Sequence, residues 1–156
     1  MQEMKNKYLV FQLENDSFGI SLSAVNEVIS FMPITPLYEV SNYLVGVINL
    51  RGKIIPILDL RLKFHLPKKE YTERTIFIIV NIEYQGYSSL LGLAVDMVKD
   101  VITIEDKDLQ QPPEVGFKFK SKYLLGIVQF QEEIITILDI NQILTTEEII
   151  EIQENS

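Results

Sequence analysis

The stretch YLVGVINLRGKIIPILDLRLKF, residues 43–64, aligns without gaps with YLLGIVQFQEEIITILDINQIL, residues 123–144. Both copies consist of short runs rich in Ile, Val, Leu and Tyr, which is typical of β-strands. The identical pairs are Tyr43/Tyr123, Leu44/Leu124, Gly46/Gly126, Ile54/Ile134, Ile55/Ile135, Ile57/Ile137, Leu58/Leu138 and Asp59/Asp139. An internal repeat of this kind indicates two related structural units.

A second, weaker repeat precedes each copy. FGISLSAVNEVI at 18–29 resembles LGLAVDMVKDVI at 91–102. The units occur in the same order, and each alone is too small to bury much apolar surface. We therefore expect a mainly β protein built as a pseudo-symmetric pair of small barrels that share a core. The matched positions of this second repeat are Gly19/Gly92, Val25/Val98, Val28/Val101 and Ile29/Ile102.

The remaining pattern adds further strands and two helical stretches. Residues 21–29 carry Leu22, Val25 and Ile29 at helical spacing, which predicts a helix, and an acidic helix is expected from about 141 to 154. The segment 112–122 has two prolines and a basic run, which indicates a loop. The predicted strands lie at 8–13, 43–50, 53–60, 75–83, 89–95, 123–130 and 134–140.

Composition excludes several classes of function. The net charge of −8 over 156 residues disfavours a nucleic-acid partner, which needs clustered Lys and Arg. The absence of cysteine excludes disulfides and Cys-ligated zinc. The opening residues lack a signal peptide's apolar core, and no apolar run is long enough for a membrane span. We expect a soluble intracellular protein with no cofactor, no metal and a single surface histidine, His65.

The two copies of the main repeat differ where the strands turn. The first has NLRGK at 49–53 and the second has QFQEE at 129–133. Gly52 suits a turn position with positive φ and presents Arg51 at the surface. Pro56 cannot donate a strand hydrogen bond, which predicts an edge or a bulge. Since the scaffold is shared, we expect specialised function where the copies differ.

Asp59 and Asp139 occupy the same place in the two copies, at the end of an ILD run. Two aspartates from two related halves also form the dyad of an aspartic protease. Neither is followed by the glycine that such a site needs, and each precedes a helix-like turn. An N-cap that accepts backbone N–H bonds is therefore the favoured role, and a hydrolase remains a second hypothesis.

Taken together, these motifs resemble the CheW family of chemotaxis coupling proteins. The similar stretches, in family order, are YLVFQL, FGISLSAVNEVI, YLVGVINLRGKIIPILDLRLKF, ERTIFIIV, LGLAVDMVKDV and YLLGIVQFQEEIITILDI. The resemblance covers one domain at 8–144, with a first barrel region at about 14–70 and a second at about 74–144. It implies that the barrels are five-stranded, SH3-like and exchange chain segments. Residues 145–156 are expected to form an acidic helix or tail.

The family resemblance also implies a function. It implies a non-catalytic adaptor in the bacterial cytoplasm, associated with receptor arrays at the inner membrane. Its expected partners are the signalling tip of a chemoreceptor and the regulatory domain of the histidine kinase CheA. A related adaptor role in another chemosensory-type pathway, such as control of type IV pili, stays open.

Carried onto this sequence, the receptor-side surface is expected at Val25, Glu27, Gly46, Arg51 and Val101. An apolar groove with an arginine at its edge suits the apolar ridge of a helical-hairpin tip. Arg51 has two possible roles: direct contact with the receptor, or an internal brace to Glu27.

The second half offers a weaker prediction. It keeps an acid at Asp100 but has Gln131 in place of Arg51, so it cannot form the same pair. Phe130 and Ile134 are candidates for the kinase side, although apolar strand residues more often belong to the core. The kinase-binding residues are therefore left unassigned.

Overall fold

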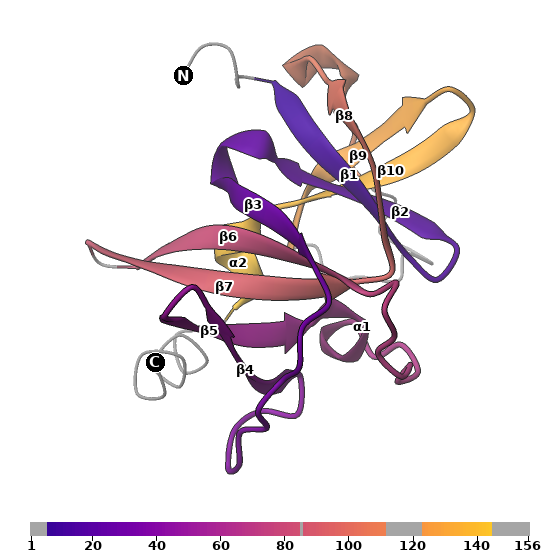
Figure 1. Ribbon diagram of the computed structural model, residues 1–156. Coiled ribbons are helices and arrows are strands. Elements are labelled where there is room, and N and C mark those ends of the chain that lie inside the picture. Colours follow the sequence, from indigo (N-terminus) through magenta and orange to yellow (C-terminus); the bar gives the residue numbers. More distant parts are fainter. Residues whose placement is uncertain (1–5, 85, 112–122, 145–156) are drawn as a thin grey trace.

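The structure, a computed structural model, describes residues 6–84, 86–111 and 123–144 and is mainly β (Figure 1). Sheet A has the order β8-β1-β2-β10-β9 and lies in the upper right of Figure 1, and sheet B has the order β3-β6-β7-β5-β4 and lies in the lower left. These two five-stranded sheets confirm the predicted fold class. Sheet A comprises β1 (Lys7–Leu13), β2 (Asp16–Ser21), β8 (Met97–Thr103), β9 (Leu124–Phe130) and β10 (Glu133–Leu138). Sheet B comprises β3 (Val25–Ser30), β4 (Leu44–Leu50), β5 (Lys53–Asp59), β6 (Ile76–Tyr84) and β7 (Tyr87–Val95).

Each sheet takes strands from both halves of the chain. The segment 14–70 supplies β2 to sheet A and β3, β4 and β5 to sheet B. The segment 74–144 supplies β6 and β7 to sheet B and β8, β9 and β10 to sheet A, while β1 of sheet A precedes both segments. Parallel pairing joins the halves, β10 to β2 in sheet A and β5 to β7 in sheet B. The halves are therefore interleaved.

The matched glycines of the second, weaker repeat, Gly19 and Gly92, lie where these halves meet. A Cβ on Gly19 would lie 2.8 Å from Cδ1 of Ile137, and one on Gly92 would lie 2.5 Å from Cδ1 of Ile57. Both glycines are paired in register with those isoleucines across the parallel strands. The repeat therefore preserves a glycine wherever an isoleucine of the neighbouring strand needs the space.

The core has a shared centre and two smaller clusters. The shared cluster joins residues from both sheets, including Phe11 and Phe18 of sheet A and Ile78 and Leu93 of sheet B. A second cluster lies on the other face of sheet A, and a third lies on the other face of sheet B around Phe77. Both sheets thus bury two faces, which explains why their strands read as continuous apolar runs.

Two short α-helices follow the equivalent strands β5 and β10. They are α1 (Leu60–Lys63) and α2 (Ile140–Ile143). Single turns of 3-10 helix occur at Leu22–Ala24 and Asp106–Asp108. The predicted loop at 112–122 and the predicted tail at 145–156 lie outside the described residues. Of the stretch where a C-terminal helix is expected, the described part holds α2, which ends at Ile143 before an extended Leu144.

The helix predicted at 21–29 is wrong. Only Leu22–Ala24 is helical, as one 3-10 turn, and β3 begins at Val25. Val25, Glu27 and Ile29 alternate with more exposed residues, and β3 pairs antiparallel with β6 along its length. The spacing fits either period, and the β-branched residues with a partner strand available favour the strand.

Pro56 lies inside β5 at a point where one neighbour is missing. β5 pairs with β4 at Pro56, but its parallel pairing with β7 begins only at Ile57. In the second copy, the parallel pairing of β10 with β2 begins at Ile135, so Thr136, the equivalent of Pro56, has a paired strand on both sides. Pro56 therefore marks the point where the ladder of an interior strand ends, not the edge of a sheet.

Candidate functional site

The β4–β5 turn presents the arginine that the second copy lacks. Leu50 pairs with Lys53, so the loop has two residues, and both have positive φ, 51° for Arg51 and 87° for Gly52. This is the pattern of a type I′ hairpin turn. The Gly52 N–H also donates to Oδ1 of Asn49 at 2.9 Å. The turn is therefore rigidly specified and holds Arg51 outward.

Arg51 forms an ion pair with Glu27 of β3, from Nη2 to Oε1. Since β3 and β4 are opposite edges of sheet B, the pair joins the turn at one edge to the strand at the other. The Arg51 side chain nevertheless remains 68% exposed, against 30% for Glu27. The pair forms an internal brace and still leaves most of the guanidinium open to a partner.

The other residues expected at the receptor surface lie in different settings. Val25 is half-buried at the start of β3, against the shared core. Val101 is 42% exposed on β8, the edge strand of sheet A. Gly46 is buried in β4, and a Cβ there would lie 2.3 Å from the Thr35 carbonyl oxygen. The structure brings Glu27 and Arg51 together on sheet B, places Val25 on the other face of β3, and gives Gly46 a packing role.

Gly46 allows a short extra pairing at the edge of sheet B. Thr35 and Val47 exchange two backbone hydrogen bonds of 2.8 Å. The second half repeats this arrangement at Gly126, where Gln110 and Ile127 exchange bonds of 2.8 and 2.7 Å. This contact explains why the glycine pair is identical in the two copies.

The second half has its own ion pair, with the charges reversed. Lys99 of β8 contacts both carboxylate oxygens of Glu133 at 2.8 and 3.0 Å, and Ser17 Oγ donates to the same carboxylate. The hydrogen bonds from Lys99 and then Ser17 hold the pKa of Glu133 below its usual value. In the repeat alignment, Lys99 matches Asn26, which is the residue before Glu27. Glu133 matches Lys53, which lies two residues after Arg51. Sequence reasoning misses this pair, although the changes of charge at those two positions could have indicated it.

The core position favoured for Ile134 is wrong. Its side chain is 61% exposed at the start of β10, and the equivalent Ile54 is 48% exposed. Phe130, by contrast, is partly buried against the apolar cluster of sheet A. Residues next to a hairpin turn are covered by few side chains from other elements, so an apolar strand pattern alone does not predict that they are buried. Ile134 therefore offers an apolar contact for a partner.

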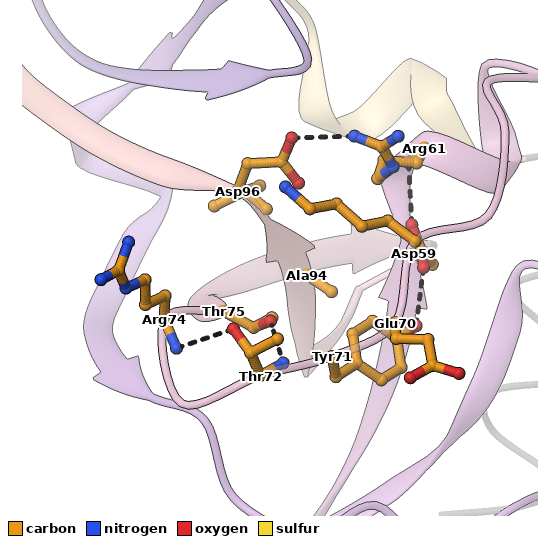
Figure 2. A pocket seen from close by; sticks show the side chains of 11 residues that line it. Asp59, Arg61, Glu70, Tyr71, Thr72, Arg74, Thr75, Ala94 and Asp96 are labelled. Atoms are coloured by element: carbon orange, nitrogen blue, oxygen red, sulfur yellow. Dashed lines mark hydrogen bonds and ion pairs between the residues drawn. The ribbon is translucent and has the colours of Figure 1, made fainter.

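Asp59 and Asp139 lie at the N-caps of the two short helices. Asp59 is 1% exposed and accepts from the N–H groups of Arg61 and Leu62 and from the Tyr71 hydroxyl at 2.6 Å (Figure 2). Asp139 accepts from the Asn141 N–H at 3.1 Å. Burial and the hydrogen bond to Asp59 raise the pKa of the Tyr71 phenol. Each carboxylate is thus committed to its own helix.

Within the part of the chain that the structure describes, no helix is long and apolar enough to cross a membrane. Among these same residues, no three acidic or histidine side chains are grouped in a way that could hold a metal ion.

Comparisons with known proteins agree with this architecture. The family model of the CheW-like domain matches residues 7–148. The chain is 33% identical to chemotaxis protein CheW of Bacillus subtilis, over 90% of this chain and 88% of that protein. It is 32% identical to chemotaxis protein CheW of Klebsiella aerogenes, over 91% and 83%, and 27% identical to protein FrzA of Myxococcus xanthus, over 91% and 87%.

A solved structure supports the same assignment. The crystal structure of the scaffolding protein TtCheW from Thermoanaerobacter tengcongensis matches with a TM-score of 0.80 and 31% identity, over 92% of this chain and 90% of that one. The interleaved sheets, the repeat and the match over nearly the whole chain lead to one conclusion: the chain belongs to the CheW-like family.

Proposed function

We propose that this protein is a non-catalytic adaptor that joins the signalling tip of a chemoreceptor to the regulatory domain of CheA. It would act in the cytoplasm, in receptor arrays at the inner membrane. Family membership supports the adaptor role, and the matched TtCheW structure is that of a scaffolding protein. The observation that carries the receptor side is Arg51, which is 68% exposed on a turn whose arginine and glycine occur in the first half but not in the second.

The receptor-side surface combines charge with apolar area. Glu27 orients the Arg51 guanidinium, while Val25, beyond the register shift in β3, packs against the shared core on the other face of the sheet. A planar guanidinium held in place loses less entropy on binding, which makes Arg51 a candidate hot spot. Val101, on sheet A, extends the proposed surface to the second sheet.

The kinase-side surface is proposed at the hairpin end that carries Ile134. Its 61% exposure gives an apolar contact for a partner. Apolar side chains of this kind commonly form the centre of a protein interface, with a polar rim around them.

A binding experiment with separate partners tests both assignments. A receptor-tip fragment and a CheA regulatory domain are titrated individually into the wild type, Arg51→Ala and Ile134→Ser, by isothermal titration calorimetry. Gln131→Ala is the matched control, because Gln131 holds the equivalent turn position in the second half. We expect Arg51→Ala to weaken receptor binding about tenfold or more and Ile134→Ser to weaken kinase binding. A folded wild type that binds neither fragment would contradict the proposal.

The similarity to FrzA supports a second candidate, an adaptor of another chemosensory pathway. The same surfaces would then serve a different receptor and kinase. Binding to the kinase of such a pathway in preference to CheA, in the same titration, would favour it.

A further inference from the structure

Arg61, near the end of the first copy of the repeat, is a buried cation with three acceptors. It lies in α1, and its side chain is 5% exposed. Its Nη1 donates to Asp96 Oδ2 at 2.8 Å, its Nη2 to a Glu14 carboxylate oxygen, and its Nε to the Pro67 carbonyl at 3.1 Å (Figure 2 shows the pair with Asp96). We call Arg61, Glu14 and Asp96 the Arg61 cluster.

The members of the Arg61 cluster come from both sheets. Arg61 directly follows β5 of sheet B, whereas Glu14 lies in the turn between β1 and β2 of sheet A. Asp96 lies where the chain passes from β7 in sheet B to β8 in sheet A. Asp96 Oδ2 also accepts from the Glu14 N–H at 2.8 Å, and the Asp96 N–H donates to the Gln12 carbonyl. One guanidinium therefore links the two sheets at a crossover of the chain.

The equivalent junction in the second half lacks the arginine. Asn141 aligns with Arg61, and its Oδ1 accepts one exposed hydrogen bond of 3.4 Å from the Glu83 N–H. Glu83 occupies the place in the β6–β7 hairpin that Glu14 occupies in the β1–β2 hairpin. Ser23 aligns with Asp96 and removes the acid. Among the described residues, buried charge thus joins the sheets at Arg61, whereas the side chain of the equivalent Asn141 accepts one long hydrogen bond.

We propose that the Arg61 cluster fixes the relative orientation of the two sheets, so that Arg61 is a positioning residue for the surfaces they carry. Charge-assisted bonds from a planar guanidinium are directional, and a buried charge that loses them is left with the cost of its desolvation. Few other orientations of the sheets satisfy both carboxylates, which come from separate segments. Insofar as the receptor-side surface spans both sheets, through Arg51 and Val101, this inference rests on the proposed function.

The orientation can be measured without any partner. The chain has no cysteine, so spin labels on Ser88→Cys in sheet B and Gln129→Cys in sheet A report one distance by double electron–electron resonance. Both positions are exposed. Arg61→Lys keeps the positive charge but loses the planar set of guanidinium N–H donors, and Asp96→Asn removes the negative charge of one acceptor. Asn141→Ala is the matched control at the junction that lacks the arginine.

We expect one narrow distance distribution for the wild type and Asn141→Ala, and a broadened or shifted distribution for Arg61→Lys and Asp96→Asn. Hydrogen exchange should show that the strands of both sheets stay protected in these variants. An unchanged distribution in Asp96→Asn and Arg61→Lys, with stability lowered, would overturn the positioning role in favour of a purely structural one. Wild-type failure to bind the receptor fragment would contradict the proposed function but would leave this distance measurement standing.

Discussion

Gly46→Ala tests whether this glycine serves packing or direct contact with a receptor. The added Cβ would lie 2.3 Å from the Thr35 carbonyl oxygen and 2.4 Å from Cγ2 of Ile34. The Thr35 contact is with backbone, so the segment must move and the two Thr35–Val47 hydrogen bonds are lost. Lost backbone bonds cost about 0.5–1.5 kcal/mol each, and overpacking costs about 1–3 kcal/mol.

The free energy of unfolding should therefore fall by about 2–6 kcal/mol, a large part of the roughly 5–15 kcal/mol of an ordinary domain. Two other glycines provide a graded series. A Cβ on Gly126 would lie 2.9 Å from the Gln110 carbonyl oxygen, which predicts a smaller loss of about 1–3 kcal/mol. Gly52 has nothing within 4 Å, so its alanine variant should lose only about 1 kcal/mol, because of its positive φ.

The assay is urea unfolding followed by circular dichroism, with receptor-tip binding measured below the transition. We expect losses in the order Gly46→Ala, Gly126→Ala, Gly52→Ala, and any loss of receptor binding in Gly46→Ala should accompany the loss of stability. A Gly46→Ala variant that is as stable as Gly52→Ala but no longer binds receptor would refute the packing role and favour direct contact.

Three further outcomes are expected from the turns and ion pairs. Glu132→Gly should raise the unfolding free energy by about 1 kcal/mol, because Glu132 has φ 66° in a two-residue turn; no gain in urea unfolding would contradict this. A double-mutant cycle of Glu27→Ala and Arg51→Ala should give a coupling of about 0.2–1 kcal/mol, as for exposed pairs, and a much larger value would make the brace the dominant role of Arg51. Glu133→Gln should be less stable than the wild type at pH 7. The lowered pKa of Glu133 beside Lys99 adds stability above the unfolded-state pKa of about 4.3, so this difference should shrink as the pH falls from there through the folded-state pKa, and a difference that does not shrink below about pH 4 would contradict it.

The repeat predicts much of the fold because identical residues meet identical constraints. Gly46 and Gly126 each make room for a short backbone pairing at the edge of a sheet, and Asp59 and Asp139 cap equivalent helices. These are local requirements, which a sequence pattern records directly.

Features that depend on distant contacts are harder to predict from sequence. The spacing over 21–29 fits a helix, and only the pairing of β3 with β6, which lies far along the chain, makes it a strand. Lys99 and Glu133 do not align with Glu27 and Arg51, so a search of the second half for the equivalents of Glu27 and Arg51 does not find its ion pair. The partners of Arg61 likewise come from two other segments, at Glu14 and Asp96.

The central claim is that one molecule joins two partners at once, and sedimentation velocity tests it most directly. The wild type is mixed with the receptor-tip fragment and the CheA regulatory domain together, with each pair run as a reference. The account predicts a species larger than either binary complex, which Arg51→Ala reduces to the complex with the kinase domain alone. If the two partners displace one another, or if neither sediments with the folded protein, the adaptor account is contradicted.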